Sequence, residues 1–239
     1  MHFHDVSLII VGLFSEVLGT ISGFGSSTFF VPYALFFEKL QLVLALTAIL
    51  HCFGNISKLA LFKFKIDKAL FLKLVVPSIL LTGIGALLTK FIHIEYLQRI
   101  LGFVLVLLPL TQFLSRKIPI KGTVRFSIIL TGISGFTTGL IGTGGAIRGL
   151  ALTLLNIEKN SFIALSAAID LGGDLTRAGI YIYNGYMDWD QWFYIPLLGL
   201  AAISGAWLGR RIVNSFSQKQ FKKSVAVFVF LSGITMILK

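Results

Sequence analysis

The chain has 239 residues, of which 56% are hydrophobic and 13% are charged. Soluble domains carry about 25% charged residues, so this composition excludes an ordinary soluble domain. The formal net charge of +11 would suggest nucleic acid binding in a soluble protein, but the basic residues here concentrate in short segments between apolar runs. Such segments are typical of cytoplasmic loops beside anionic lipid, so we expect a lipid bilayer and no nucleic acid as partner.

Apolar runs follow one another along the whole chain. They cover residues 6–37, 42–62, 70–88, 100–114, 126–155, 162–183, 192–208 and 225–238. Several are close to the ~20 residues that a membrane-crossing helix needs. The chain begins "MHFHDVSL", without a basic segment, so we expect no cleaved signal peptide. The sequence predicts an all-α fold, that of a polytopic helical membrane protein without a separate soluble domain.

Two glycine-rich stretches interrupt these runs. "GFGSSTFFVP" begins at Gly23 and "GTGGAIRGLA" begins at Gly142, which is 142 − 23 = 119 residues later. The run 126–155, at roughly 30 residues, is too long for one crossing and too short for two full ones. A hairpin of two short helices that turns near "GTGGA" fits this length, and we expect short broken helices at both stretches.

The interval of 119 residues recurs elsewhere, which indicates an internal repeat. Adding 119 to four further positions gives the pairs Gly54 and Gly173, Asn55 and Asp174, Lys58 and Arg177, Pro77 and Pro196. With a shift of one residue, "GALLTKF" at Gly85 resembles "GAWLGRR" at Gly205. We therefore predict a first membrane repeat over 1–115, a cytoplasmic linker over 116–122 and a second membrane repeat over 123–239.

The charged segments predict how the two repeats are oriented. Segments 63–68, 115–125 and 210–223 are rich in Lys and Arg and are expected in the cytoplasm, whereas 184–191 has two acids and no Lys or Arg and is expected outside. Crossings counted from these sides give each repeat about five segments and leave both termini outside. Because that number is odd, the halves are predicted to be inverted-topology repeats, the build of many secondary transporters, in the cell (inner) membrane.

A glycine-rich break leaves free N–H groups at the start of the next helix, where they attract anions. Small residues spaced by four, as in Gly19–Gly23 and Gly135–Gly139, alternatively serve close helix packing. The matched positions favour a site, and the candidate substrate-binding residues are Gly25, Ser26, Ser27, Thr28, Asn55, Thr143, Gly144, Gly145, Arg148 and Arg177.

Charged residues inside the apolar runs have two interpretations. Arg148 would either pair with an oxyanion in bidentate fashion or extend its head to the membrane interface. Asp170, Asp174 and Arg177 share a helix face, so they form either a structural ion-pair ladder or a proton-coupling group, with Asp170 and Asp174 as coupling carboxylates. His51, one turn before Asn55, is a weaker candidate for the coupling proton, and we expect it to be a hydrogen-bonded residue of the bundle.

No cluster of residue types in the sequence indicates catalysis. There is no metal-ligand cluster of His, Cys and carboxylates, no nucleophile elbow and no phosphate-binding lysine motif. The single cysteine, Cys52, cannot form an intrachain disulfide. We therefore expect neither an enzyme nor a bound metal or cofactor.

At the glycine-rich stretches the sequence resembles the sulfite exporter TauE/SafE family of bacterial membrane transporters. "SGFGSSTFFVP" ending at Pro32 and "GLIGTGGAIRG" ending at Gly149 carry the resemblance, together with "YIYNGYMD" and the Gly205–Gly209 stretch, and it extends over essentially the whole chain. The family's glycine-rich positions fall on Gly23, Gly25, Ser26 and Ser27, and on Gly142, Gly144, Gly145 and Ala146. Two serines in the first break and Arg148 after the second depart from the family pattern.

The resemblance implies transport of a small anion, namely sulfite, a sulfonate or another organosulfur anion. With the predicted repeats it suggests alternating access, with possible proton coupling. The alternatives are an anion channel, which shares the helix-terminus chemistry, and a non-transporting membrane scaffold. A bundle of this kind can act as a monomer or as a homodimer.

Overall fold

The computed structural model describes residues 3–63, 67–91, 103, 106 and 123–237, and the predicted apolar runs within these ranges form helices. The bounds of the long helices are α1 Phe3–Ser22, α3 Leu40–Leu61, α4 Lys68–Leu88, α6 Val124–Ile141, α8 Lys159–Tyr183, α9 Tyr194–Asn214 and α10 Gln218–Ile237. The short ones are α2 Ser27–Ala34, α7 Gly145–Thr153 and the 3₁₀ turn η1 Trp189–Gln191. Most of the predicted run 100–114 and the linker 116–122 lie outside the described residues.

Five of the described helices are long and apolar enough to cross a membrane. These spans are His4–Ser22, Leu40–Leu61, Lys68–Leu88, Val124–Ile141 and Trp189–Asn214. Helix α8 has 25 residues and is long enough to cross a membrane, but it is not among these five apolar spans. It carries the charged residues Asp170, Asp174 and Arg177. Large apolar side chains are exposed on the outer faces of these helices, where lipid would cover them. The described chain is therefore a polytopic helical membrane protein, as its composition predicted.

Both glycine-rich stretches interrupt a helix, as predicted. Helix α1 ends at Ser22 before α2 begins, and α6 ends at Ile141 before α7 begins. Gly23 has φ 80° and Gly142, the residue 119 positions later, has φ 74°. Gly25 has φ 117°. Residues with a Cβ rarely adopt such angles, so glycine is what lets the chain reverse at these points.

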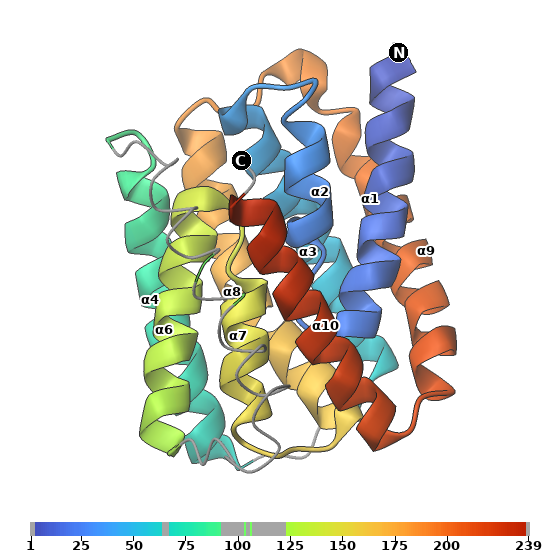
Figure 1. Cartoon of the computed structure of the whole chain (residues 1–239). Coiled ribbons are helices and arrows are strands. Elements are labelled where there is room, and N and C mark those ends of the chain that lie inside the picture. The colour runs from blue at the N-terminus through green and yellow to red at the C-terminus, as the bar shows by residue number, and fades with distance from the viewer. Residues whose placement is uncertain (1–2, 64–66, 92–102, 104–105, 107–122, 238–239) are drawn as a thin grey trace.

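The two helix hairpins enter the bundle from opposite ends (Figure 1). Helices α1 and α2 open toward the upper end, where the N-terminus lies, whereas α6 and α7 open toward the lower end. Helix α1 packs along α9, α4 packs along α6, and the central helices α3 and α8 contact each other. This arrangement brings the two breaks to the middle of the bundle.

Glycines permit the closest helix contacts. A Cβ added at Gly139 would stand 2.0 Å from the Thr82 carbonyl oxygen of α4, and one at Gly135 would stand 2.3 Å from that of Ser78. On α4, a Cβ at Gly85 would stand 2.2 Å from the Phe136 carbonyl oxygen of α6. The packing interpretation of the Gly135–Gly139 spacing is therefore confirmed.

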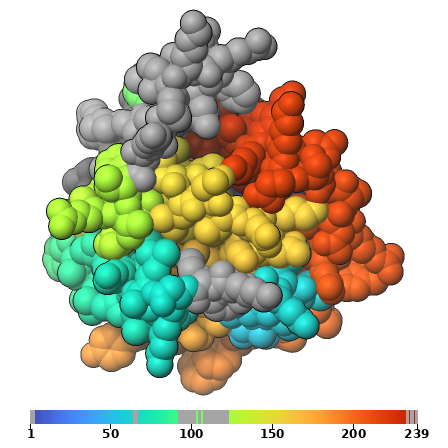
Figure 2. All heavy atoms as spheres, turned by 90° about the horizontal axis from the view of Figure 1, so that it is seen from below, coloured from blue at the N-terminus to red at the C-terminus, as the bar shows by residue number. Residues whose placement is uncertain are grey.

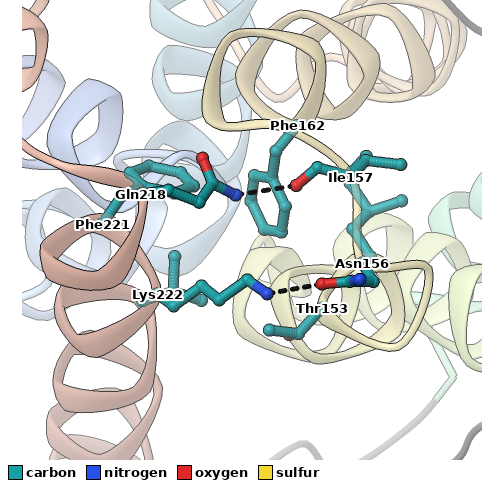
Figure 3. A pocket seen from close by; sticks show the side chains of 9 residues that line it. Thr153, Asn156, Ile157, Phe162, Gln218, Phe221 and Lys222 are labelled. Carbon is teal, nitrogen blue, oxygen red and sulfur yellow. Dashed lines mark hydrogen bonds between the residues drawn. The ribbon is translucent and has the colours of Figure 1, made fainter.

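A set of polar contacts closes the lower end between α10 and the α7–α8 turn (Figure 3). The Gln218 side-chain amide donates to the Ile157 carbonyl at 2.9 Å, and Nζ of Lys222 donates to Oδ1 of Asn156 at 2.5 Å. Beside them the rings of Phe162 and Phe221 pack edge to face at 5.3 Å. We call Asn156, Ile157, Gln218 and Lys222 the lower clasp. Viewed from below, the α7–α8 connection fills the middle of this face (Figure 2).

The contact between α4 and α6 can be tested with Gly139→Ala. We expect a loss of about 1–3 kcal/mol in the free energy of unfolding, because the added methyl group forces two tightly packed backbones apart. Thermal unfolding in detergent would measure it. The matched control is Gly179→Ala on α8, where an added Cβ meets no atom within 4 Å and little change is expected. Equal stability of both variants would contradict the close packing.

Candidate functional site

The two helix breaks touch each other in the middle of the bundle. A Cβ at Gly145, the first residue of α7, would stand 2.1 Å from the carbonyl oxygen of Phe24 in the first break. The same carbonyl accepts a hydrogen bond from Nη2 of Arg148 at 2.6 Å. Contacts between residues more than 120 positions apart therefore join the breaks, and charged side chains gather around them.

Arg148 is the first of two buried arginines at this junction. Its guanidinium donates to both carboxylate oxygens of Asp170 on α8, and its Nε donates to the Ser166 hydroxyl at 2.9 Å. Only 1% of the Arg148 surface is exposed. The alternative that Arg148 extends to the membrane interface is therefore wrong, because the side chain is held inside the bundle by a paired carboxylate.

Arg177 is the second buried arginine, and it lies on α8 itself. Its Nε donates to Oδ1 of Asp174 at 2.8 Å, and its Nη1 donates to the Thr138 carbonyl of α6 at 3.4 Å. The other carboxylate oxygen of Asp174 accepts from the side-chain amide of Asn55 at 2.8 Å. Asn55 and Asp174 are 119 residues apart, so two positions matched by the repeat interval bond directly to each other.

The expected ladder along α8 forms only in part. Arg177 pairs with Asp174 three residues earlier, but Asp170 turns to Arg148 of α7. Each aspartate therefore has its own arginine. The pairing of Asp170 joins two elements whose proximity the sequence alone does not reveal.

His51 lies between the Arg148–Asp170 and Arg177–Asp174 ion pairs, and only 3% of its surface is exposed. Its Nδ1 is 3.5 Å from Nη2 of Arg177 and 3.6 Å from Oδ2 of Asp174. Among the described residues its buried Nε2 has no hydrogen-bond partner. The ring lies inside the bundle, as expected, and makes its polar contacts through Nδ1.

Sequence reasoning missed one charged residue of this group, Glu16 on α1. Its Oε1 lies 2.6 Å from Nζ of Lys58, and its Oε2 accepts from the Ser26 hydroxyl at 2.7 Å. Gly54 makes room for this carboxylate, because a Cβ there would stand 2.5 Å from Glu16 Oε1. The sequence contained a sign of this residue, because Glu16 is the single acid within the apolar run 6–37.

The remaining predicted residues flank this group. Ser27 and Thr28 are buried in the first turn of α2, and Thr143 is half-buried between α6 and α7. The carbonyl of Gly144 accepts from the Ser134 hydroxyl at 2.8 Å, and a Cβ at Gly144 would stand 2.1 Å from the Ser134 carbonyl. Gly144 and Gly145 therefore have a packing role here.

We call these buried residues the central network: Glu16, Ser26, His51, Asn55, Lys58, Arg148, Asp170, Asp174 and Arg177. It contains three carboxylates and three side chains that carry a positive charge. His51, Asp170 and Asp174 offer ligand atoms within 4.8 Å of one another. These carboxylates are already bound by Arg148, Arg177 and Asn55, so a metal ion would have to displace arginine, and the arrangement fits a metal poorly.

Apolar spans around broken helices and a buried charged centre define a polytopic membrane protein. Residues 8–236 match the family described as sulfite exporter TauE/SafE, and the chain belongs to this family of membrane transporters. It is 24% identical to the probable membrane transporter protein YunE of Bacillus subtilis (strain 168), over an alignment that covers 98% of this chain and 94% of that protein. No solved structure matches the chain.

The pairing of Arg148 with Asp170 predicts a specific pattern of stability. Arg148→Met should lower the free energy of unfolding by about 3–5 kcal/mol, because it leaves the Asp170 carboxylate buried without a counter-charge. The double variant Arg148→Met/Asp170→Asn should recover part of that loss, since neither charge remains. Unfolding in detergent measures both, and a double variant that is less stable than the single one would argue against the pair.

Proposed function

We propose that the protein transports a small anion, namely sulfite, a sulfonate or another organosulfur anion, by alternating access. The observation that carries the proposal is the meeting of two helix breaks beside two buried arginines. Helix N-termini and arginine side chains both attract oxyanions, and at membrane depth such groups are retained where they line a solute path. Membership of a sulfite exporter family supports the same class of substrate.

The halves are proposed to be inverted repeats. Gly23 and Gly142 share left-handed angles at matched positions, and the two hairpins enter from opposite ends. The contact of α1 with α9 corresponds to that of α6 with α4 under the same interval. A pseudo-two-fold axis in the membrane plane would pass near the bond between Asn55 and Asp174.

The lower end in Figure 1 is proposed to face the cytoplasm and the N-terminus to lie outside. The described segments at the lower end are the end of α3, the starts of α4, α6 and α10, the α7–α8 turn and the end of α9. They carry Lys63, Lys68, Arg125, Lys159, Arg210, Arg211, Lys219, Lys222 and Lys223, alongside the acids Asp67 and Glu158. The upper end is formed by the start of α1, the α2–α3 and α8–α9 connections and the residues after α4, which carry Asp5, Glu38, Asp188 and Asp190, alongside Lys39 and Lys90. This difference follows the positive-inside rule.

Alternating access is supported by the difference between the two ends. The upper end has hollows of about 310 and 550 Å³, both lined by Glu38, Leu42 and Gln191. The lower clasp encloses a hollow of only about 10 Å³, which is the size of one water. Phe162 and Phe221 pack against the first break, since a Cβ at Gly23 would stand about 3 Å from both rings. Opening the lower clasp would connect the centre with the cytoplasmic side.

Anion binding is tested by the thermal stability of the purified protein with sulfite, thiosulfate, sulfate, taurine, sulfoacetate, acetate and chloride. A ligand at about a hundred times its dissociation constant stabilises the folded state by about 2.7 kcal/mol. We expect stabilisation by a sulfur oxyanion and its loss in Arg148→Lys and Arg177→Lys, which keep the charge but lose the planar guanidinium.

The matched control is Arg125→Lys, an exposed arginine at the lower end. It should keep the full stabilisation. If folded protein were stabilised by none of the anions, the proposed substrate class would be wrong. If the two buried variants bound as well as the control, the anion site would lie elsewhere.

The lower clasp is tested by cross-linking. In a Cys52→Ser background, Asn156→Cys and Lys222→Cys would be joined by a short, reducible bifunctional thiol reagent. We expect anion flux in proteoliposomes to stop on cross-linking and to return on reduction, because α10 can no longer move away from the α7–α8 turn. Flux that continues in cross-linked protein would contradict this gate, and the single-cysteine variants provide the control.

A further inference from the structure

The central network is electrically balanced without its histidine. Lys58, Arg148 and Arg177 face Glu16, Asp170 and Asp174 in three ion pairs. A monovalent anion that entered this buried region would leave it with one uncompensated negative charge. Burying such a charge costs several kcal/mol, so the anion must arrive with a positive partner or displace one of the carboxylates.

Gly25 of the first break lies against the middle of this network. A Cβ on Gly25 would be in ordinary van der Waals contact with Cε1 of His51 at 3.4 Å and with Nη2 of Arg148 and Oδ2 of Asp170, both at 3.7 Å. The His51 ring, the Arg148–Asp170 pair and the first break therefore meet at one place, so a change in the charge of the ring acts on the groups around the break.

The aspartates are poorly suited to carry a coupled proton. Both oxygens of Asp170 accept from Arg148, and the oxygens of Asp174 accept from Arg177 and Asn55. A proton on either carboxylate would break a charge-assisted bond and leave a buried guanidinium without its partner. Among the described residues Nε2 of His51 has no hydrogen-bond partner, so in the tautomer whose Nδ1–H faces Oδ2 of Asp174 a proton on Nε2 breaks no bond.

Resting on the proposed anion transport, we infer that His51 is the coupling residue, and that one anion binds at the central network together with one proton on the His51 ring. Histidine is the side chain whose charge changes most readily near neutral pH. Its protonation makes the centre positive by one charge, and a monovalent anion restores the balance. Transport of a monovalent anion is then an electroneutral anion–proton symport. This assignment replaces Asp170 and Asp174 as the expected coupling groups.

The charged and titratable groups around His51 come from every element of the network. Helix α8 contributes Asp170, Asp174 and Arg177, α7 contributes Arg148, α1 contributes Glu16, and α3 itself carries Cys52 and Lys58. Apart from the free thiol of Cys52, each of the other groups is held in a Lys–Glu or Arg–Asp ion pair, and Nδ1 of His51 lies 3.6 Å from Oδ2 of Asp174. A proton taken up with the anion therefore has His51 as its acceptor.

The test counts protons taken up on anion binding by the full chain in detergent, with a pH indicator in weakly buffered solution. The probes are methanesulfonate, which stays a monovalent anion near neutral pH, and sulfite. We expect proton uptake that approaches one proton per bound methanesulfonate where His51 of the free protein is neutral, and an affinity that there falls with rising pH, approaching tenfold per pH unit. For sulfite, which titrates itself, the difference between wild type and His51→Gln should be about one proton.

In His51→Gln, proton uptake with methanesulfonate should vanish and its affinity should no longer depend on pH. His51→Asn is a second variant in case the first does not fold, and His4→Gln, outside the network, is the matched control that keeps the uptake. Binding by the wild type without proton uptake would overturn the role of His51 and leave anion transport standing. Proton uptake that persists in His51→Gln would also overturn the role of His51 and leave anion transport standing. Failure of every anion to bind would overturn both proposals.

Discussion

Ion pairing in an apolar surrounding is the constraint on which the centre of this protein depends. A charge buried at membrane depth must meet an opposite charge, because neither lipid nor packed side chains can solvate it. Three pairs meet this demand. Arg148 joins α7 to α8 and Lys58 joins α3 to α1, whereas Arg177 pairs with Asp174 within α8, and Asp174 joins α8 to α3 through Asn55.

The helix breaks make that pairing possible. Left-handed glycines end α1 and α6 inside the bundle, so backbone carbonyls and N–H groups face the centre rather than lipid. The Phe24 carbonyl then accepts from Arg148, and the start of α7 packs directly against it. A centre made of charged side chains and irregular backbone has few ways to repack. We therefore expect large conformational changes at the ends of the bundle, where the lower clasp consists of a few hydrogen bonds at the surface.

The helices and breaks could be predicted from particular residues. Apolar runs of sufficient length specified α3, α4 and α9, and the pair Gly23 and Gly142 specified both breaks. The predicted run 225–238 began too late, because α10 starts at Gln218 in a polar segment that packs against the α7–α8 turn. Amphipathic starts of this kind are stabilised by tertiary contacts, which hydropathy does not record.

The sequence by itself determined the class of protein, the helix breaks, the matched positions 119 residues apart and the presence of buried charges. These follow from local rules, since lipid requires apolar runs and a left-handed turn requires glycine. Only the tertiary structure decided the partners: Asp170 with Arg148 rather than Arg177, Glu16 with Lys58, and an unpartnered Nε2 on His51. Pairing depends on distances between helices far apart in the chain, and no local pattern of residues contains those distances.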